Sequence, residues 1–172
     1  MEQLSQDFPY DEELAPKVFF LCTAESLETL PAVVHPQSAN FGLFIAMDAT
    51  TVSTDAIYTA ALTLVKRGLA SLCVWGPDCE RVHDTFDRAL IELNPDETDA
   101  NVVITTWLAS ESLAEAVWFF VYCAFPASAY QQTCSNWIAS VICNPEWEKP
   151  VREAISAETS KKRFSRERKK SK

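Results

Sequence analysis

Short apolar runs alternate along this chain with segments of helical periodicity, and this alternation limits the possible folds more than any other feature. The runs that predict strands are residues 17–23, 41–47, 69–75, 101–106 and 135–143. Strands that alternate with amphipathic helices are typical of a mostly parallel sheet with helices on both faces. We therefore predict a single three-layer α/β domain, Rossmann-like or flavodoxin-like, with about five mostly parallel strands.

Capping patterns indicate where several of the predicted helices begin and end. Ser53 or Thr54 can cap a helix that follows the second strand, and Gly68, preceded by two cations, ends it. Ser112 and Glu115 have the spacing of a capping box for a later helix. Pro145 is suited to the first position of the last helix, because a helix needs no amide hydrogen there.

Length and composition favour one domain with distinct ends. We predict an acidic irregular lead-in over residues 1–16, an α/β domain over 17–158 and a basic disordered tail over 159–172. The longest uncharged apolar stretch, residues 116–125, has about half the length of a bilayer-spanning helix, so no transmembrane segment is expected. The amino-terminal residues contain no apolar signal core, and the six cysteines form no C-x-x-C pair. These features favour a cytoplasmic protein with reduced thiols.

The charge is divided unequally between the body and the tail. Residues 1–160 carry 23 acidic and 7 basic side chains, whereas residues 161–172 carry 8 basic side chains and one acidic side chain. A body this acidic repels phosphates, so general nucleic-acid binding by the body is not expected. It favours a basic protein as partner. The tail either contacts an anionic surface or is a solvated end that lies on the acidic body.

The stretch from Trp75 to Asp84 is the strongest candidate for a functional site. It joins a predicted strand to a predicted helix, and ligands of α/β proteins bind at the carboxyl ends of strands. The chain has only three glycines, too few at any one turn for a glycine-rich nucleotide-binding loop. Asp78 and Glu80 would also repel a phosphate from the start of this helix. Classical nucleotide binding is therefore not expected.

Cys79, His83 and Asp87 are candidate catalytic residues. They are spaced four residues apart and so share one face of the predicted helix. A cysteine in a first helical turn can have a lowered pKa, and a histidine one turn later could act as its base. Against this interpretation, the neighbouring acidic residues disfavour the thiolate, and Cys79 is equally well placed to enter the core.

A metal site is a second interpretation of the same corner. The candidate ligands are Asp48, Asp78, Glu80, His83 and Asp84, which converge if the second and third predicted strands are neighbours. Carboxylates with one histidine suit Mg²⁺ or Mn²⁺ better than Zn²⁺. A purely structural interpretation explains most of these acidic residues without a ligand, because Asp78 can cap the helix and Glu80 favours its dipole. We therefore expect no cofactor, with Mg²⁺ or Mn²⁺ as the alternative.

Two tryptophans lie at predicted strand ends. Trp75 ends the third strand, and Trp107 follows Thr105 and Thr106 at the end of the fourth. They could form one aromatic wall for a planar ligand or for a partner's side chain. Packing over the rim of the sheet is the alternative.

The residues of this corner resemble the pattern of an uncharacterised bacterial domain family with a Rossmann-like layout. The resemblance extends from Val18 to Trp147 and depends on two motifs, W-G-x-D-C-E-R-x-H-D at residues 75–84 and T-T-W at residues 105–107. It implies the fold and assigns no activity, so no catalytic residue is carried over from it.

Two functions remain open from the sequence. The first is an acidic binding module that holds a protein partner on its strand-end surface, as a toxin-neutralising or defence-related protein would. The second is a metal-assisted or cysteine-dependent hydrolase or transferase acting at the acidic corner. The candidate binding residues are Trp75, Asp78, Glu80, Arg81, His83, Asp84, Thr105, Thr106 and Trp107.

Overall fold

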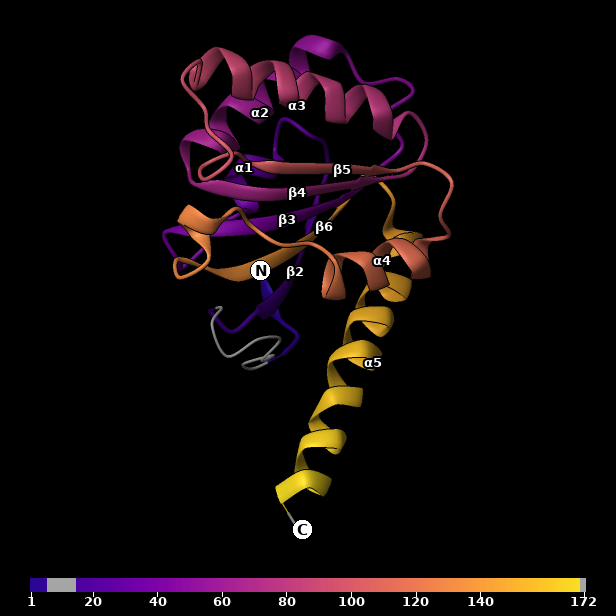
Figure 1. Cartoon of the computed structure of the whole chain (residues 1–172). Coiled ribbons are helices and arrows are strands. Elements are labelled where there is room, and N and C mark those ends of the chain that lie inside the picture. Colours follow the sequence, from indigo (N-terminus) through magenta and orange to yellow (C-terminus); the bar gives the residue numbers. More distant parts are fainter. Residues whose placement is uncertain (6–14, 171–172) are drawn as a thin grey trace.

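A twisted sheet forms the middle layer of the molecule, with helices on both of its faces (Figure 1). The computed structural model describes residues 1–5 and 15–170, with side chains through residue 160. The strands are β1 (Glu2–Gln3), β2 (Val18–Ala24), β3 (Asn40–Ala46), β4 (Leu69–Trp75), β5 (Ile104–Leu108) and β6 (Cys134–Ile142). The helices are α1 (Leu30–Val33), α2 (Thr54–Lys66), α3 (Cys79–Leu93), α4 (Leu113–Tyr122) and α5 (Pro145–Lys170), with a 3₁₀ turn at Ser128–Tyr130.

The strand order explains which parts of the sheet are exposed at its edges. In the described residues the order is β1-β2-β6-β3-β4-β5, with β2, β6, β3, β4 and β5 parallel and β1 antiparallel to β2. The predicted three-layer α/β fold with a mostly parallel sheet is confirmed. The last strand, β6, is inserted between β2 and β3. As a result β5 lies at one edge of the described sheet, where β4 is its one pairing partner among residues 1–5 and 15–170.

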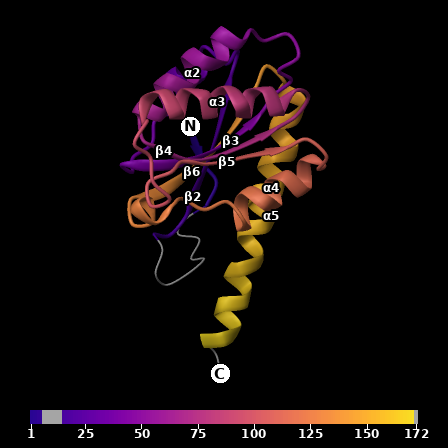
Figure 2. The same ribbon diagram turned by 45° about the horizontal axis from the view of Figure 1, so that its top comes forward.

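The two faces of the sheet carry separate apolar clusters. Helices α1, α2 and α3 pack on one face, and α4 and α5 pack on the other. Figure 2 shows α2 and α3 side by side above the sheet. Alternate residues of β3 divide between the clusters, with Phe41 and Leu43 toward α2 and Phe44 toward α4. Strands buried on both faces read as continuous apolar runs, which is why they were recognisable in the sequence.

The helix ends follow the capping patterns of the sequence. The Ser53 hydroxyl accepts a hydrogen bond of 3.2 Å from the Ala56 amide at the start of α2. Ser112 and Glu115 form the complete capping box of α4. Each interaction satisfies amide groups that have no partner within the helix. The described helices include none long and apolar enough to cross a membrane.

Three segments differ from the sequence-based predictions. The lead-in contains a short strand, β1, whose residues pair with β2; residues 6–14 lie outside the described part of the chain. Strand β5 begins at Ile104, three residues later than predicted, because Asn101 is held in a turn by hydrogen bonds with Thr98. Helix α5 continues to Lys170, across the segment predicted as a disordered tail, and extends away from the body (Figure 1).

A buried lysine holds the carboxyl end of α4 against the sheet. Lys17 is 3% exposed, and its Nζ atom donates hydrogen bonds to the carbonyl oxygens of Val121 (3.1 Å) and Ala124 (2.7 Å). The ammonium also lies 3.9 Å from the centre of the Trp137 ring. A cation is favourable here because the last carbonyls of a helix carry a partial negative charge.

Replacing Lys17 with methionine is expected to lower the free energy of unfolding by about 2 kcal/mol, since two buried carbonyl groups lose their donor. The unbranched methionine side chain keeps most of the packing. Urea unfolding of both proteins measures the difference. Lys149→Met, at an exposed position of α5, is the control and should leave the free energy unchanged within about 0.5 kcal/mol. Equal losses in the two variants would contradict a specific role for Lys17.

Candidate functional site

The corner between β4 and α3 is packed tightly against the end of β3. Gly76 has a φ angle of 117°, and a Cβ atom on this residue would lie 2.1 Å from the carbonyl oxygen of Met47. The amide of Met47 in turn donates a 3.1 Å hydrogen bond to the carbonyl oxygen of Trp75. Only glycine tolerates both the positive φ and the close approach of backbone.

The variant Gly76→Ala is therefore expected to lose about 2–3 kcal/mol of unfolding free energy, because its Cβ atom strains the corner. Thermal and urea unfolding measure this loss. A proper comparison is Ala56→Gly, a change of the opposite sense early in α2 that should cost no more than about 1 kcal/mol. A fully stable Gly76→Ala protein would show that the corner can move away from β3.

Arg81 joins the corner to the loop that follows β3. Its guanidinium forms a 2.6 Å ion pair with Asp78 and donates to the carbonyl oxygens of Val52 (2.9 Å) and Ala49. Asp78 is the residue before α3, but its left-handed backbone (φ 63°) is accompanied by no capping hydrogen bond from its side chain. The expected capping by Asp78 is therefore wrong. Through its pairing with Arg81, Asp78 instead helps to connect the loop before α3 with the loop after β3.

A second group of polar residues lies beside this corner, between α3 and β5. The His83 ring is buried, with Nδ1 3.0 Å from Asp84 Oδ1 and Nε2 3.1 Å from Thr105 Oγ1. The hydroxyl of Thr105 donates a 2.8 Å hydrogen bond to Asp87 Oδ1. The Trp107 ring covers the imidazole, with 4.5 Å between ring centres and an interplanar angle of 56°. The structure thus brings together five predicted site residues, four from the binding candidates and Asp87 from the catalytic candidates.

These hydrogen bonds leave His83 poorly suited to act as a base. Nε2 of His83 lies 3.1 Å from the hydroxyl oxygen of Thr105, whose hydrogen is donated to Asp87. Nδ1 lies 3.0 Å from a carboxylate oxygen of Asp84. Both ring nitrogens are therefore occupied by protein oxygens, and neither is free to contact a substrate. The arrangement attaches α3 to β5.

Cys79 does not join this cluster. Its side chain is buried in the apolar cluster beneath α2 and α3, beside Val82 and Phe86. Burial raises the pKa of the Cys79 thiol, and hydrogen bonds to nearby backbone groups offset this only in part. The thiol is thus protonated at neutral pH and shielded from solvent. The predicted arrangement of cysteine, base and orienting carboxylate on one helix face is not formed.

Alkylation with iodoacetamide is expected to modify Cys143 at least about ten times faster than Cys79, because the reactive species is an accessible thiolate. Cys143 is exposed, whereas Cys79 is buried and its pKa is raised. Mass spectrometry of peptides after brief labelling measures both rates, and labelling in urea shows that each thiol is reactive once unfolded. Faster labelling of Cys79 than of Cys143 in the folded protein would instead support a nucleophilic role for Cys79.

The candidate metal ligands do not converge. Strands β3 and β4 are neighbours, as the hypothesis required. The carboxylate of Asp48, however, accepts hydrogen bonds from the amide (3.0 Å) and hydroxyl (2.6 Å) of Thr50, which lower its pKa. Asp78 is paired with Arg81, and Glu80 is exposed on the first turn of α3. Within the described part of the chain, no group of three or more His, Cys, Asp or Glu side chains could hold a metal ion.

The two tryptophans lie on opposite faces of the sheet. Trp75 packs edge-on against Trp147 of α5, with 4.9 Å between ring centres, and its indole donates to the carbonyl of Glu111. Trp107 lies on the face covered by α3, where it contacts His83. Thr106, between Thr105 and Trp107, points to the other face because side chains alternate along a strand. The two indoles therefore form no common wall.

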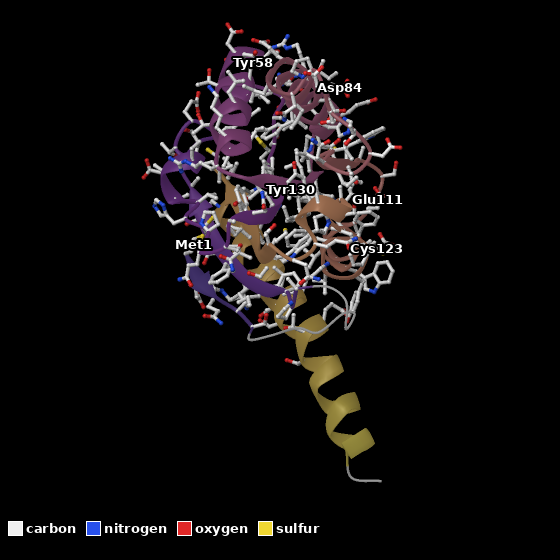
Figure 3. The ribbon with its side chains drawn as sticks, turned by 60° about the vertical axis from the view of Figure 1, so that its left-hand side comes forward. Met1, Tyr58, Asp84, Glu111, Cys123 and Tyr130 are labelled. Atoms are coloured by element: carbon white, nitrogen blue, oxygen red, sulfur yellow. The ribbon has the colours of Figure 1, made fainter. Side chains whose placement is uncertain are left out.

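Exposed apolar residues lie along β5 and on the neighbouring part of α3. Trp107 is 45% exposed and Ile104 39% exposed, both on β5, and Ile91 of α3 is 68% exposed. An open depression of about 450 Å³ runs along α3 and is lined by Asp84, Asp87, Arg88, Ile91 and Glu92. Figure 3 shows Asp84 at the outer surface of the molecule.

We call the strand β5 with its flanking residues Asp84, Asp87 and Ile91 the β5 edge. Sequence reasoning found Asp84 and Trp107 and missed Ile91 and Ile104. Ile91 is an apolar residue outside the buried stripe of α3. This position could have indicated from the sequence that Ile91 is exposed. No comparable signal marks Ile104, because its exposure depends on the position of β5 in the sheet.

Comparison with known proteins finds a domain family that covers most of the chain. A family model described as a domain of unknown function (DUF7684) matches residues 18–160. This span includes strands β2–β6 and all of the residues of the β5 edge. The resemblance to an uncharacterised domain family is thereby confirmed. No curated protein matches the chain.

Proposed function

This chain belongs to the family of the domain of unknown function DUF7684, and from its own residues we propose that it is a cytoplasmic binding module for a basic protein. The partner binds at the β5 edge, where the predicted strand-end residues His83, Asp84, Thr105 and Trp107 are found together. A toxin or another basic protein that must be neutralised is the class of partner that this charge favours.

The observation that supports this proposal most strongly is the exposed indole of Trp107 on β5, the edge strand of the described sheet. Tryptophan is enriched among the residues that dominate binding energy at protein interfaces. Its ring is held by contact with His83, which is itself bound to Asp84 and Thr105. An aromatic side chain that is already positioned loses little conformational entropy on binding.

The acidic charge of the body also supports a basic partner. Residues 1–160 contain 23 acidic and only 7 basic side chains. Asp84 and Asp87 place two of these carboxylates beside Trp107. An acidic surface accelerates the encounter with a basic partner and favours it over acidic proteins.

The alternative, a hydrolase or transferase, is favoured by no specific observation in the described residues. The Cys79 thiol is buried, protein oxygens occupy both ring nitrogens of His83, and the predicted metal ligands stay apart. We therefore argue the binding function alone.

Photocrosslinking in the cells that produce the protein tests this proposal. A photoreactive phenylalanine analogue is placed at position 104, on β5 itself, so that Trp107 is kept, and, as the control, at position 118 of α4. Ile104 is 39% exposed and Trp118 is 48% exposed. We expect one basic protein to be crosslinked from position 104 only, and the crosslink to weaken at 0.5 M salt, on the order of the ionic strength that screens surface charges. Equal crosslinking from both positions, or none from position 104, would exclude the proposal.

A further inference from the structure

We propose that the partner binds the β5 edge as an extended cationic segment that pairs with β5 and adds a strand to the sheet. This inference rests on the proposed function and specifies its recognition mode. In such binding, backbone hydrogen bonds contribute affinity, and alternate side chains contribute specificity.

Strand β5 forms an unprotected edge of the sheet in the described part of the chain. Among the described residues it pairs with β4 alone, and in a parallel pair about half of the backbone donors and acceptors of a strand point away from its neighbour. Proteins usually protect such edges with charged side chains, proline, bulges or very short strands. Its sequence Ile-Thr-Thr-Trp-Leu contains no charge, proline or glycine, and its pairing with β4 shows no shift of register.

The opposite edge of the same sheet, formed by β1 and β2, is protected. There β2 is covered by β1, a strand of only two residues. Glu2 of β1 is also ion-paired with Arg152 of α5. A short, charged strand is a common form of edge protection. The described chain thus protects one edge of its sheet and leaves β5 open at the other.

The charges beside β5 indicate which occupant it takes. A second copy of the chain, pairing β5 with β5 about a twofold axis, would bring a second set of Asp84 and Asp87 to the same interface. Like charges at an interface oppose association. The nearest cation on this flank, Arg88, lies over the ring of Tyr58, 4.7 Å from its centre. A cationic segment is therefore favoured over a second copy.

The alternation of side chains along β5 predicts which residues of the segment are favoured on each face of the sheet. Thr105 and Trp107 face α3, so a partner side chain on that side meets the Trp107 ring and the two carboxylates. Arginine suits this position because its guanidinium stacks on indole and pairs with carboxylate. On the other face the neighbouring side chain meets Ile104, which favours an apolar residue. The expected segment alternates arginine or lysine with valine or isoleucine.

A synthetic peptide of alternating arginine and valine, about seven residues long and capped at both ends, is the probe for this mode. It is titrated into the full chain while deuterium exchange of the backbone amides is followed by mass spectrometry. We expect slowed exchange at residues 104–108. A peptide of the same sequence with alternate amides N-methylated keeps every charge, and it should bind at least ten times more weakly, because it cannot form the ladder.

Three results would overturn strand addition. These are equal binding of the methylated and unmethylated peptides, protection confined to segments other than β5, and a dimer through β5 in sedimentation experiments on the chain alone. The proposed function fails separately. If position 104 crosslinks a basic partner while β5 amides exchange at the same rate in that complex, the partner binds the edge without adding a strand. If no partner crosslinks there, the binding function itself fails.

Discussion

Replacing Trp107 with alanine is expected to weaken binding of the basic partner by about 30-fold to 1,000-fold, equivalent to about 2–4 kcal/mol. Trp107 is the aromatic residue of the β5 edge, and it is 45% exposed and so available to a partner. The same ring covers His83, so its loss also loosens the side chain that connects Asp84 to Thr105. Titration calorimetry with the crosslinked partner, once purified, measures the change in affinity.

Trp118→Ala is the matched control for this experiment. Trp118 is equally exposed but lies on α4, on the other face of the sheet from His83. Its replacement should change affinity by less than about threefold, as most interface-remote substitutions do. Unfolding curves of both variants show whether either change acts through stability. Equal losses of affinity from the two substitutions would show that the partner does not recognise the β5 edge.

The layers of this fold were predictable because their causes are local. The apolar runs of β2, β3, β4 and β6 reflect burial on both faces, and caps such as Ser53 and the pair Ser112–Glu115 act within one turn of helix. The strand order was not predictable in this way. The insertion of β6 between β2 and β3 depends on pairing between residues 94 to 118 positions apart. It is this insertion that leaves β5 at an edge.

The candidate site was predicted only in part, because long-range packing decides which of its side chains meet. Trp75 and Trp107 both end strands, which suggested one aromatic wall. The register pairs Trp75 with Leu108 and Val74 with Trp107, so the pleat sends the two indoles to opposite faces. The left-handed backbone of Asp78 likewise has no sequence signature, and it turns this carboxylate toward Arg81. His83 was recognised as a site residue, but its bond to Thr105 requires knowing how α3 lies on β5.

Raising the pH from 9 to 12 is expected to unfold the protein, because two deeply buried thiols resist ionisation only while the chain is folded. Burial raises the pKa of Cys73 and of Cys134 to about 12, and the nearby Lys17 ammonium opposes this without overcoming it. Burial and a hydrogen bond to Glu158 likewise raise the pKa of Tyr122 to about 12. All three groups ionise more readily in the unfolded chain.

The raised pKa values of the folded state make stability fall as the pH rises. Below pH 9 the thiols are protonated in both states, and their contribution to stability is complete. As the pH rises toward 12 the unfolded chain releases these protons first, so the free energy of unfolding falls. Three pKa units correspond to about 4 kcal/mol for each thiol. Two thiols therefore approach the total stability of a typical domain, about 5–15 kcal/mol.

Urea unfolding at intervals between pH 7 and pH 12, at constant ionic strength and with a reducing agent, measures this dependence. The double variant Cys73→Ala, Cys134→Ala separates the thiols from other groups that titrate in the same range. Its two small cavities should lower stability at pH 7, by about 1–2 kcal/mol at each site. Its stability should then fall less steeply with pH than that of the unaltered chain, since only Tyr122 and the remaining groups still lose protons on unfolding. Parallel curves for the two proteins would show that ionisation of Cys73 and Cys134 does not drive the alkaline transition.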